Sequence, residues 1–450
     1  MQWPGRKMRS SVKISAFVTL VGILILYNLL RVTTPPITIS WEQYVQRQNG
    51  TKSILLWNAS GGTLQSKKGR VEVTSFGTGK DLFAEKNCTY TRCEIVDNRW
   101  DRPLEYFDAI VVLFNDEFVT ADQLKMPEFG IKRNQSQRLV FASQEAPPAL
   151  KPYYNMTQLA HFFNWTMTYR IDSDIQLLYG WIIPKENAPR TPEEISNLRE
   201  RARVSLPPDS KHKKTKSVAW MVSHCKTHGQ RETYVKELSR YIDVDIFGKC
   251  GHLTCTKHPL HISDPQCYDM IELTYKFYLS FENAICPDYV TEKFFKILAH
   301  DIIPIVYGGV DYAQYAPPHS YIDARKFKPK ELAAYLKLLD ANDTLYNEYF
   351  WWKDYYDVKY SIEDMSRHGF CDLCQKLHEQ QVGDFRTYKE LDSEWGESNK
   401  CQPFDPGWIS DPSEEILLKE NSKKTMCFIL LVALLCIGLF ACGYVCKNKS

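Results

Sequence analysis

The sequence lacks an excess of charge of either sign, and it lacks a repeat. Lys and Arg number 56 and Asp and Glu 54, so the formal net charge is +2. This balance argues against a nucleic-acid binder with a broad basic face. No collagen-like, heptad or other internal repeat is found, which excludes fibrous and repeat architectures. Charged residues make up 24% and hydrophobic residues 44% of the 450 residues, values typical of a globular protein with about three domains, or two domains plus attached segments.

Cysteine and aromatic residues are plentiful. The chain has 14 Cys, which is many for a cytosolic protein of this size, so we expect an oxidising compartment. Aromatic residues make up 13%. This proportion is too high for a disordered chain and suggests surfaces that stack on rings or sugars.

An uncharged stretch of 17 residues, 14–30, follows four basic residues near the N-terminus: Arg6, Lys7, Arg9 and Lys13. Its length is at the short end for a membrane-spanning helix, and the preceding basic residues favour a cytosolic N-terminus. A cleaved signal peptide is the alternative, but no small-residue cleavage site follows. We therefore expect a cytosolic tail (1–13), an uncleaved signal anchor (14–32) and a stem (33–52) that leads into a lumenal domain.

A second uncharged stretch, 426–446, has 21 residues with lysines on both sides. It is long enough to cross a membrane, and a second crossing would return the C-terminus to the cytosol. A lipid-anchor signal is one alternative, which the charged end disfavours, and a buried hydrophobic helix is another. Membrane lipid is therefore an expected partner of both ends.

Eight Asn-x-Ser/Thr sequons occur in the chain, and seven of them lie between the two uncharged stretches. This distribution fits a glycosylated lumenal domain. The seven predicted glycosylation sites are Asn49, Asn58, Asn87, Asn134, Asn155, Asn164 and Asn342. The eighth, Asn448, follows the second stretch, and we expect it to carry no glycan.

Short apolar runs alternate with helical patterns and predict an α/β protein with two domains. The first domain (53–190) has expected strands at 53–57, 109–114 and 138–142. A Pro-containing, charged linker (191–216) precedes the second domain (217–365). There we expect strands at 217–222, 244–247, 277–281 and 302–307, and helices at 229–242, 289–300 and 329–340. Fully apolar strands predict parallel sheets covered on both faces. A Cys-containing segment (366–425) follows.

Polar residues cluster where the strand at 277–281 ends and the next helix begins. Carboxylate, amide, ring and ammonium groups at a helix N-terminus are suited to a nucleotide diphosphate, because the helix dipole and free N–H groups favour anions. An ordinary solvated helix start is the alternative. The residues are Glu282, Asn283, Tyr289, Thr291, Glu292 and Lys293.

This stretch, residues 275–309, resembles the donor-binding motif of the α1,3-fucosyltransferases, an inverting family that uses GDP-fucose. Three other segments agree: 217–223 with Arg231, the acceptor-domain motif at 163–174, and the loop 141–147. The resemblance covers roughly residues 50–380. It implies a GT-B fold, with two Rossmann-like domains that face each other across a cleft, the acceptor side first. It also implies a location in the Golgi membrane.

The resemblance also assigns roles. Glu145 would be the general base that takes the proton of the acceptor hydroxyl; without the family it reads as a loop acid. Arg231 and Lys293 would hold the pyrophosphate and stabilise the leaving GDP. Tyr289 and Glu292 would contact the nucleotide sugar, and the weaker candidates Glu282 and Asn283 would lie near fucose or ribose.

Two Asp-x-Asp pairs raise the question of a metal: Asp172 with Asp174, and Asp243 with Asp245. Neither pair sits beside the donor cluster in the sequence, and we interpret both as structural. The two cations assigned to the pyrophosphate make an obligatory metal unnecessary. Stimulation by Mn²⁺ or Mg²⁺ stays open.

Cys371 and Cys374 form a Cys-x-x-Cys pair. A zinc site would need a second pair, for which Cys250 with Cys255 or Cys88 with Cys93 are candidates, but disulfides are favoured in the lumen. The family resemblance implies that Cys88 and Cys93 pair with Cys371 and Cys374. Each closure would stabilise the fold by ~4 kcal/mol in the chain-entropy model.

The acceptor is expected to be an N-glycan on a glycoprotein. The segment 244–251, with Cys255 and Cys267, resembles invertebrate family members that modify the innermost GlcNAc of N-glycans. We therefore expect transfer of fucose to the 3-hydroxyl of this core GlcNAc. Two alternatives remain: a Lewis-type enzyme acting on antennae, and an inactive glycan-binding relative, which intact Glu145, Arg231, Glu292 and Lys293 disfavour.

Overall fold

The computed structural model describes residues 50–57, 63–66, 69–72, 77–114, 136–152, 154–204, 214–255, 265–380, 386–391, 395 and 401–402. The chain divides into two compact units, Met1–Lys52 and Ser53–Ser450, and almost all described residues belong to the second. Among the described residues no helix is long and apolar enough to cross a membrane. Both uncharged stretches, 14–30 and 426–446, lie outside them.

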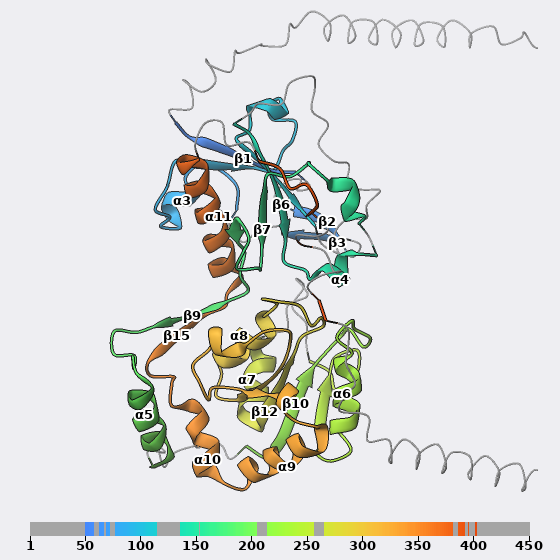
Figure 1. Ribbon diagram of the computed structural model, residues 1–450, viewed down its shortest axis with the longest axis vertical. Helices are drawn as coiled ribbons and strands as arrows, with labels where there is room; N and C mark the ends of the chain where they lie inside the picture. The colour runs from blue at the N-terminus through green and yellow to red at the C-terminus, as the bar shows by residue number, and fades with distance from the viewer. Residues whose placement is uncertain are drawn as a thin grey trace, which may run out of the picture. The chain divides into compact units, whose positions relative to one another are not determined.

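The first sheet has six strands in the order β4-β1-β5-β6-β7-β8 (Figure 1). Pairing from β1 through to β8 is parallel, as the apolar runs predict, and Val140 of β6 lies opposite Val111 of β5 and Trp165 of β7. The strands are β1 (Lys52–Leu56), β4 (Cys93–Val96), β5 (Ala109–Leu113), β6 (Arg138–Ser143), β7 (Trp165–Thr168) and β8 (Ile175–Gln176).

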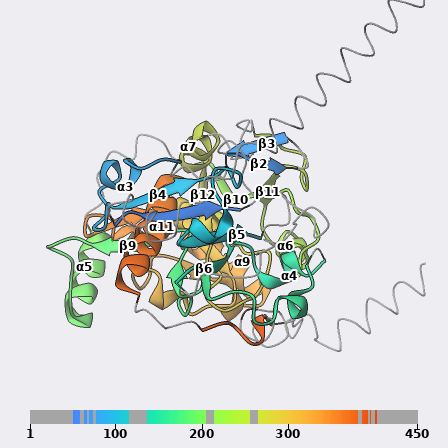
Figure 2. The same cartoon turned by 90° about the horizontal axis from the view of Figure 1, so that it is seen from above.

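Helices cover both faces of this sheet. On one face, α3 (Leu82–Glu85) and α11 (Ile362–Glu379) lie side by side, although they are far apart in sequence (Figure 1 and Figure 2). Gly369 permits the close approach of α11, because a Cβ there would lie 2.8 Å from Leu177 and from Met167. The other face packs against η1 (Leu104–Tyr106), α4 (Pro147–Leu150) and η2 (Met156–Leu159).

The second sheet is parallel throughout and has the order β11-β10-β12-β13-β14. Helices α6 and α9 cover one face, and residues of α7 and α8 pack on the other. The strands are β10 (Lys216–Met221), β11 (Val244–Phe247), β12 (Tyr275–Phe281), β13 (Ile303–Tyr307) and β14 (Ile322–Asp323). The helices are α6 (Arg231–Leu238), α7 (Pro265–Thr274), α8 (Glu292–Leu298) and α9 (Pro329–Asp340).

The remaining elements flank the sheets. Strand β9 (Trp181–Pro184) pairs antiparallel with β15 (Tyr356–Lys359), and β2 (Thr63–Ser66) with β3 (Gly69–Glu72). Short helices are η3 (Tyr312–Gln314), η4 (Ala324–Lys326), α10 (Asp343–Asn347) and η5 (Glu348–Phe350).

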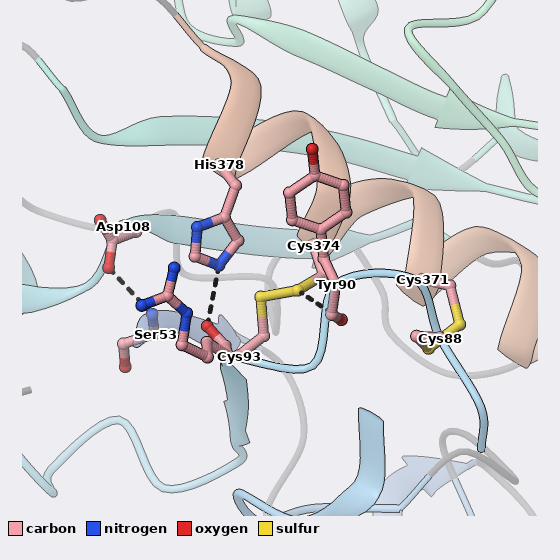
Figure 3. The surroundings of a disulfide bond; sticks show 9 residues. Ser53, Cys88, Tyr90, Cys93, Asp108, Cys371, Cys374 and His378 are labelled. Carbon is pink, nitrogen blue, oxygen red and sulfur yellow. Dashed lines mark hydrogen bonds between the residues drawn. A yellow bond between two sulfur atoms is a disulfide. The ribbon is translucent and has the colours of Figure 1, made fainter. Parts of the chain in front are cut away.

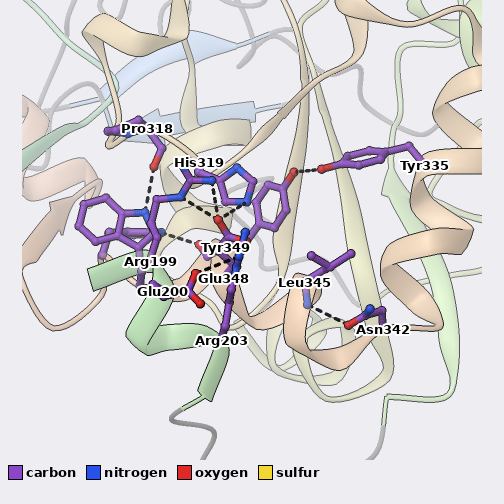
Figure 4. Close-up of polar contacts among 12 residues, drawn as sticks. Arg199, Glu200, Arg203, Pro318, His319, Tyr335, Asn342, Leu345, Glu348 and Tyr349 are labelled. Carbon is purple, nitrogen blue, oxygen red and sulfur yellow. Dashed lines mark hydrogen bonds and ion pairs between the residues drawn. The ribbon is translucent and has the colours of Figure 1, made fainter. Parts of the chain in front are cut away.

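The predicted linker, 191–216, contains a 13-residue helix, α5 (Pro192–Val204). Pro192 at its start, acidic residues in its first turn and arginines in its last turn favour a helix there. Arg199 and Arg203 each donate from Nε to the buried carboxylate of Glu348 at 2.9 Å (Figure 4). The linker is therefore fastened to the second domain through side chains almost 150 residues away in sequence.

The structure contains every strand and helix predicted above from apolar runs, with ends shifted by a few residues at most of them. The predicted ranges 244–247 and 329–340 coincide with β11 and α9. The helix predicted at 229–242 is shorter, since α6 is Arg231–Leu238. The other described strands and α-helices were not predicted from the sequence; they are β2, β3, β4, β7, β8, β9, β14, β15, α3, α4, α5, α7, α10 and α11.

The predicted pairing of the early and late cysteines is confirmed (Figure 3). Cys88 bonds to Cys371 and Cys93 to Cys374, which fastens α11 to the segment after α3 and to the first residue of β4. The possible zinc pair of Cys250 and Cys255 is not formed, because each makes a disulfide elsewhere. The other three disulfides are Cys225–Cys250, Cys255–Cys267 and Cys286–Cys401.

Asn164 is incompatible with glycosylation in this fold. Its side chain is buried, Oδ1 accepts from the N–H of Leu139 at 2.9 Å, and Nδ2 donates to the carbonyl of Arg386 at 2.7 Å. A glycan would have to replace the second bond and reach solvent from a buried atom. Among the other predicted sites Asn87, Asn155 and Asn342 are exposed, whereas Asn49, Asn58 and Asn134 lie outside the described residues, as does Asn448, for which no glycan is expected.

The two long-range disulfides are not independent, because they close nearly the same loop. The sequence separations are 283 and 281 residues. Once one bond exists, the other closes only a small ring of about eight residues, so it should contribute about 2–3 kcal/mol in the chain-entropy model. The expected ~4 kcal/mol for each bond is therefore wrong, because it treats each bond as closing a long loop of its own.

We expect removal of Cys88–Cys371 alone, or of Cys93–Cys374 alone, by paired Cys→Ala changes to lower the free energy of unfolding by about 2–3 kcal/mol. Removal of both should cost about 8 kcal/mol, more than the two single losses combined, because only then is the long loop open. Urea unfolding of residues 33–424 measures this. Single losses that add up to the double loss would contradict the shared loop.

Candidate active site

Glu145 follows β6 at the carboxyl edge of the first sheet. The parallel neighbours β5 and β7 end at the same edge, where open α/β sheets bind ligands. The N–H of Glu145 donates to Oγ of Ser143 at 3.1 Å, and Pro147 opens α4 directly afterwards. The half-buried Glu145 thus lies on a short, constrained connection between a buried strand and a helix.

Glu282 follows β12 at the carboxyl edge of the second sheet and has no exposure to solvent. Its carboxylate accepts hydrogen bonds from the N–H of Thr291 at 2.9 Å and from its hydroxyl at 2.9 Å and 3.0 Å. The ammonium of Lys293 lies 3.5 Å away. Burial raises the pKa of Glu282, and Lys293 opposes that shift. Glu282 therefore cannot reach a ribose or fucose directly; it holds Thr291 and Lys293 from behind.

Lys293 stands at the start of α8, where Thr291 is the N-cap. Its Nζ lies 2.9 Å from Oγ1 of Thr291 and 3.2 Å from the carboxylate of Glu292. Burial opposes the charge of Lys293, but Glu292 and Glu282 outweigh it and raise its pKa. Burial also disfavours the charged form of Glu292, but the effect of Lys293 is stronger. The pKa of the Glu292 carboxyl is therefore lowered. Lys293 is thus a permanent cation with 26% of its side chain exposed, and Glu292 has 48% exposed.

Arg231 opens α6 but is not a solvated helix-face residue, since only 4% of it is exposed. Its guanidinium donates to the carbonyl of Phe281, the last residue of β12, and lies 5.7 Å from the ring of Trp220. Its Nε is buried and has no partner among the described residues. Burial lowers the pKa of Arg231, and the nearby carboxylate of Glu282 opposes that shift.

Tyr289 is buried between two other tyrosines. Its ring meets Tyr169 edge-on at 4.9 Å and Tyr179 at 6.2 Å, and only 1% of the residue is exposed. Burial raises its pKa well above the usual range, so the hydroxyl is neutral. Tyr289 connects the loop after β12 to side chains that follow the first sheet, rather than presenting a ring to solvent.

A cavity of about 440 Å³, a size suited to a small-molecule site, lies among the segments that follow β6, β10 and β12. It is lined by Pro148, Ala149 and Pro152 just beyond Glu145, by residues 223–228 after β10, and by Asn283 and Ala284 after β12. Of the predicted site residues, Asn283 alone belongs to the lining, and its buried Oδ1 has no partner in the described part of the chain.

The loop at 223–228 is the part of the site that the sequence analysis missed. It follows β10 and contributes Lys226 and two imidazoles, His224 and His228, to the cavity. The disulfide Cys225–Cys250 ties it to the loop after β11. Its position in the sequence could have predicted this role, because polar residues that follow a central parallel strand lie at the edge of the sheet where ligands bind.

The Asp-x-Asp pairs make contacts to protein groups. Asp172 pairs with Arg170, and Oδ2 of Asp174 accepts from the N–H of Thr166 at 2.9 Å and from the hydroxyl of Tyr388 at 2.7 Å. Asp245 accepts from Lys216 and Tyr275, each at 2.6 Å. Each of these three carboxylates therefore has a structural role of its own.

Two other groupings of described residues have ligand-like spacing. One is Cys93, Cys374 and His378, in which the two sulfurs are bonded to each other in a disulfide. The other is Asp269, Glu272 and His300, where Glu272 already accepts from His300 and from the N–H of Asp301. None of these residues lines the cavity, so neither grouping adds to the candidate active site.

Comparison with known proteins identifies the family. Residues 49–180 match the model "Fucosyltransferase, N-terminal", and residues 211–395 match "Glycosyltransferase family 10 (fucosyltransferase) C-term". The chain is 37% identical to "Alpha-(1,3)-fucosyltransferase C" of Drosophila melanogaster over 374 residues, 80% of this chain and 81% of that protein. It is 34% identical to "Glycoprotein 3-alpha-L-fucosyltransferase A" of the same organism, over 78% of this chain and 61% of that protein.

A crystal structure described as alpha1,3-fucosyltransferase with GDP-fucose aligns with a TM-score of 0.41 and 16% identity, covering 75% of this chain and 92% of that one. The family matches span both sheets, and the first relative is matched over most of its length. The chain therefore belongs to the α1,3-fucosyltransferases of glycosyltransferase family 10.

Proposed function

We propose that the protein transfers fucose from GDP-fucose, with inversion, to the 3-hydroxyl of the innermost GlcNAc of N-glycans, and that its two domains form a GT-B cleft. The observation that carries this proposal is the common cavity. Its lining includes residues that follow Glu145, on one side, and Asn283 and residues 223–228, on the other. A carboxylate beyond one parallel sheet and cations beyond the other are what a single displacement at a sugar diphosphate needs.

In this mechanism Glu145 accepts the proton of the acceptor O3 as that oxygen attacks C1 of fucose. The bond between C1 and the β-phosphate oxygen breaks, and GDP leaves with the electron pair. One carboxylate suffices, because inversion by direct displacement needs no covalent intermediate. The acceptor hydroxyl has to come within about 2.6–3.2 Å of the carboxylate.

The donor side of the proposal rests on Lys293 and Arg231, with Glu292 as a contact to the nucleotide sugar. Lys293 is held in place by Glu282 and Thr291 while part of it stays exposed. Nε of Arg231 has no partner in the part of the chain that the structure describes, so Arg231 retains capacity for a hydrogen bond. Lys226 in the cavity lining would supply further positive charge for the diphosphate. With these cations the proposed reaction does not require a metal ion. Stimulation by Mn²⁺ or Mg²⁺ is compatible with this proposal.

The proposed acceptor rests on the segment 244–251 and its cysteines. Cys250 and Cys255 anchor this region through Cys225–Cys250 and Cys255–Cys267, so a disulfide-braced loop borders the donor side. A relative named as a glycoprotein 3-α-L-fucosyltransferase supports a glycoprotein as the acceptor. Antenna fucosylation of the Lewis type is the second candidate.

Incubation of residues 33–424 with GDP-fucose and defined N-glycans, followed by linkage analysis, tests the proposal. We expect fucose on O3 of the innermost GlcNAc. Transfer to antennae alone would replace the core assignment by the Lewis-type one, and absence of transfer to every glycan would contradict the whole proposal.

We further propose a Golgi membrane protein with a cytosolic N-terminus and a lumenal catalytic domain. The uncharged stretches 14–30 and 426–446 and the basic residues beside them support this topology.

Replacement of Glu145 by Gln should lower kcat by ~10²–10⁴, because the amide keeps the shape of the side chain but cannot take the proton. GDP affinity should be kept. Steady-state kinetics and calorimetry measure the two effects, with exposed Glu186→Gln as the matched control. Turnover near the normal rate in Glu145→Gln would exclude it as the base.

Lys293→Ala and Arg231→Ala should each weaken binding of GDP as well as GDP-fucose, since both cations are proposed to meet the diphosphate. Lys353→Ala is a suitable control, because Lys353 is similarly exposed and pairs with Asp301 at 2.6 Å away from the site. Isothermal calorimetry with GDP provides the test. Unchanged GDP affinity in both variants would rule out the donor site at the start of α8.

The proposed second crossing predicts that an epitope placed after Ser450 is digested when intact microsomes are treated with protease. Lys447 and Lys449 beyond the uncharged stretch favour a cytosolic end, and Asn448 should then carry no glycan. An epitope on the full-length protein that stays protected until detergent is added would overturn the second crossing.

A further inference from the structure

Tyr179 lies between β8 and β9 and reaches the loop that carries Glu145. Its hydroxyl donates to the backbone carbonyl of Gln144 at 2.6 Å. Gln144 is the residue directly before Glu145, so this bond fixes the peptide from which the proposed base projects.

The ring of Tyr179 also contacts the loop between β12 and α8, which carries the proposed donor-binding residues. It meets Tyr289 edge-on at 6.2 Å with an interplanar angle of 84°, and it packs against the clusters that contain Ala146 and Val290. Burial raises the pKa of Tyr179 well above the usual range, and the neighbouring Tyr289 hydroxyl counteracts part of that shift. The phenol is neutral and remains a hydrogen-bond donor across the working pH range.

The backbone beside Tyr179 is held tightly. A Cβ on Gly180 would lie 2.5 Å from the ring of Phe295 and 2.7 Å from the carbonyl of Lys359, so glycine is needed for α8 and β15 to approach this closely. Tyr179 therefore projects from a fixed point, and its hydroxyl can act as a rigid support.

The loop that carries Glu145 has few backbone donors with which to fix itself. Pro147 and Pro148 follow and have no N–H. The contacts between Ser143 and Glu145 are local, two residues apart. The bond from Tyr179 crosses 35 positions in sequence, so it supports the loop from outside its own segment.

We propose that Tyr179 is a positioning residue for the general base: its bond to Gln144 directs the carboxylate of Glu145 toward the acceptor hydroxyl. This inference rests on the proposed role of Glu145. A displacement of about 1 Å at a catalytic group can cost on the order of 10²-fold in rate. Loss of the hydrogen bond from Tyr179 should displace the loop by less than about 1 Å, so the expected loss of rate is smaller than 10²-fold.

The test is a double-mutant cycle with Tyr179→Phe, Glu145→Gln and the double variant. Tyr179→Phe should lower kcat about 10-fold and leave GDP affinity and the KM for GDP-fucose unchanged. In the Glu145→Gln background the same change should have less than about a twofold effect, because residues that act as a unit are non-additive. Tyr335→Phe is the matched control, since it removes a hydroxyl that hydrogen-bonds to Tyr349 at 2.7 Å elsewhere in the fold, and it should leave kcat unchanged.

The outcomes separate the two claims. A Tyr179→Phe defect of equal size in both backgrounds, a loss of GDP affinity, or an unchanged kcat would each overturn the positioning role while Glu145 remains the base. Turnover near the normal rate in Glu145→Gln alone would remove the base assignment and the positioning role with it.

Discussion

The edge of the second sheet that we propose to bind the donor depends on one carboxylate that never meets water, that of Glu282. A buried charge is costly unless hydrogen bonds and an opposite charge compensate it, and here Thr291 supplies two donors and Lys293 the charge. These contacts close the loop that runs from the end of β12 to the start of α8. The loop cannot open without exposing or unpairing that carboxylate.

This closed loop carries side chains that pack far from Glu282. Ala284, Cys286 and Tyr289 belong to the same hydrophobic cluster as Phe141 of β6 and Phe114, which follows β5. Cys286 is bonded to Cys401. A single buried carboxylate therefore sets the position of Lys293 and also the apolar contacts between the loop from β12 to α8 and the first sheet. The disulfide between Cys286 and Cys401 further restrains this loop.

The sequence predicted the elements whose signal is local. Strand β11 and helix α9 were placed at their observed ends, because an apolar run and a Pro-started amphipathic pattern are visible within a few residues. What it missed depends on distant partners. The helix α5 is held by Glu348, and the burial of Asn164 depends on Leu139 and Arg386. Among the site residues, Glu282 was expected near the sugar, because the sequence shows its place at a strand end but not the side chains that cover it.

The basic side chains proposed to meet the diphosphate already have acidic neighbours, and this limits how a diphosphate can bind. Lys293 lies 3.5 Å from the carboxylate of Glu282 and 3.2 Å from that of Glu292, and Glu282 also interacts electrostatically with Arg231. In the proposed reaction the incoming phosphates have to take over one partner of Lys293. Glu282 cannot yield it, because it has no exposure to water, whereas Glu292 is 48% exposed and can turn into solvent at little cost. Lys293 would then keep its place through Glu282 and Thr291 while Glu292 is freed to contact the sugar of the nucleotide. The buried carboxylate of Glu282 thus holds Lys293 in position both before and after Lys293 exchanges Glu292 for a phosphate.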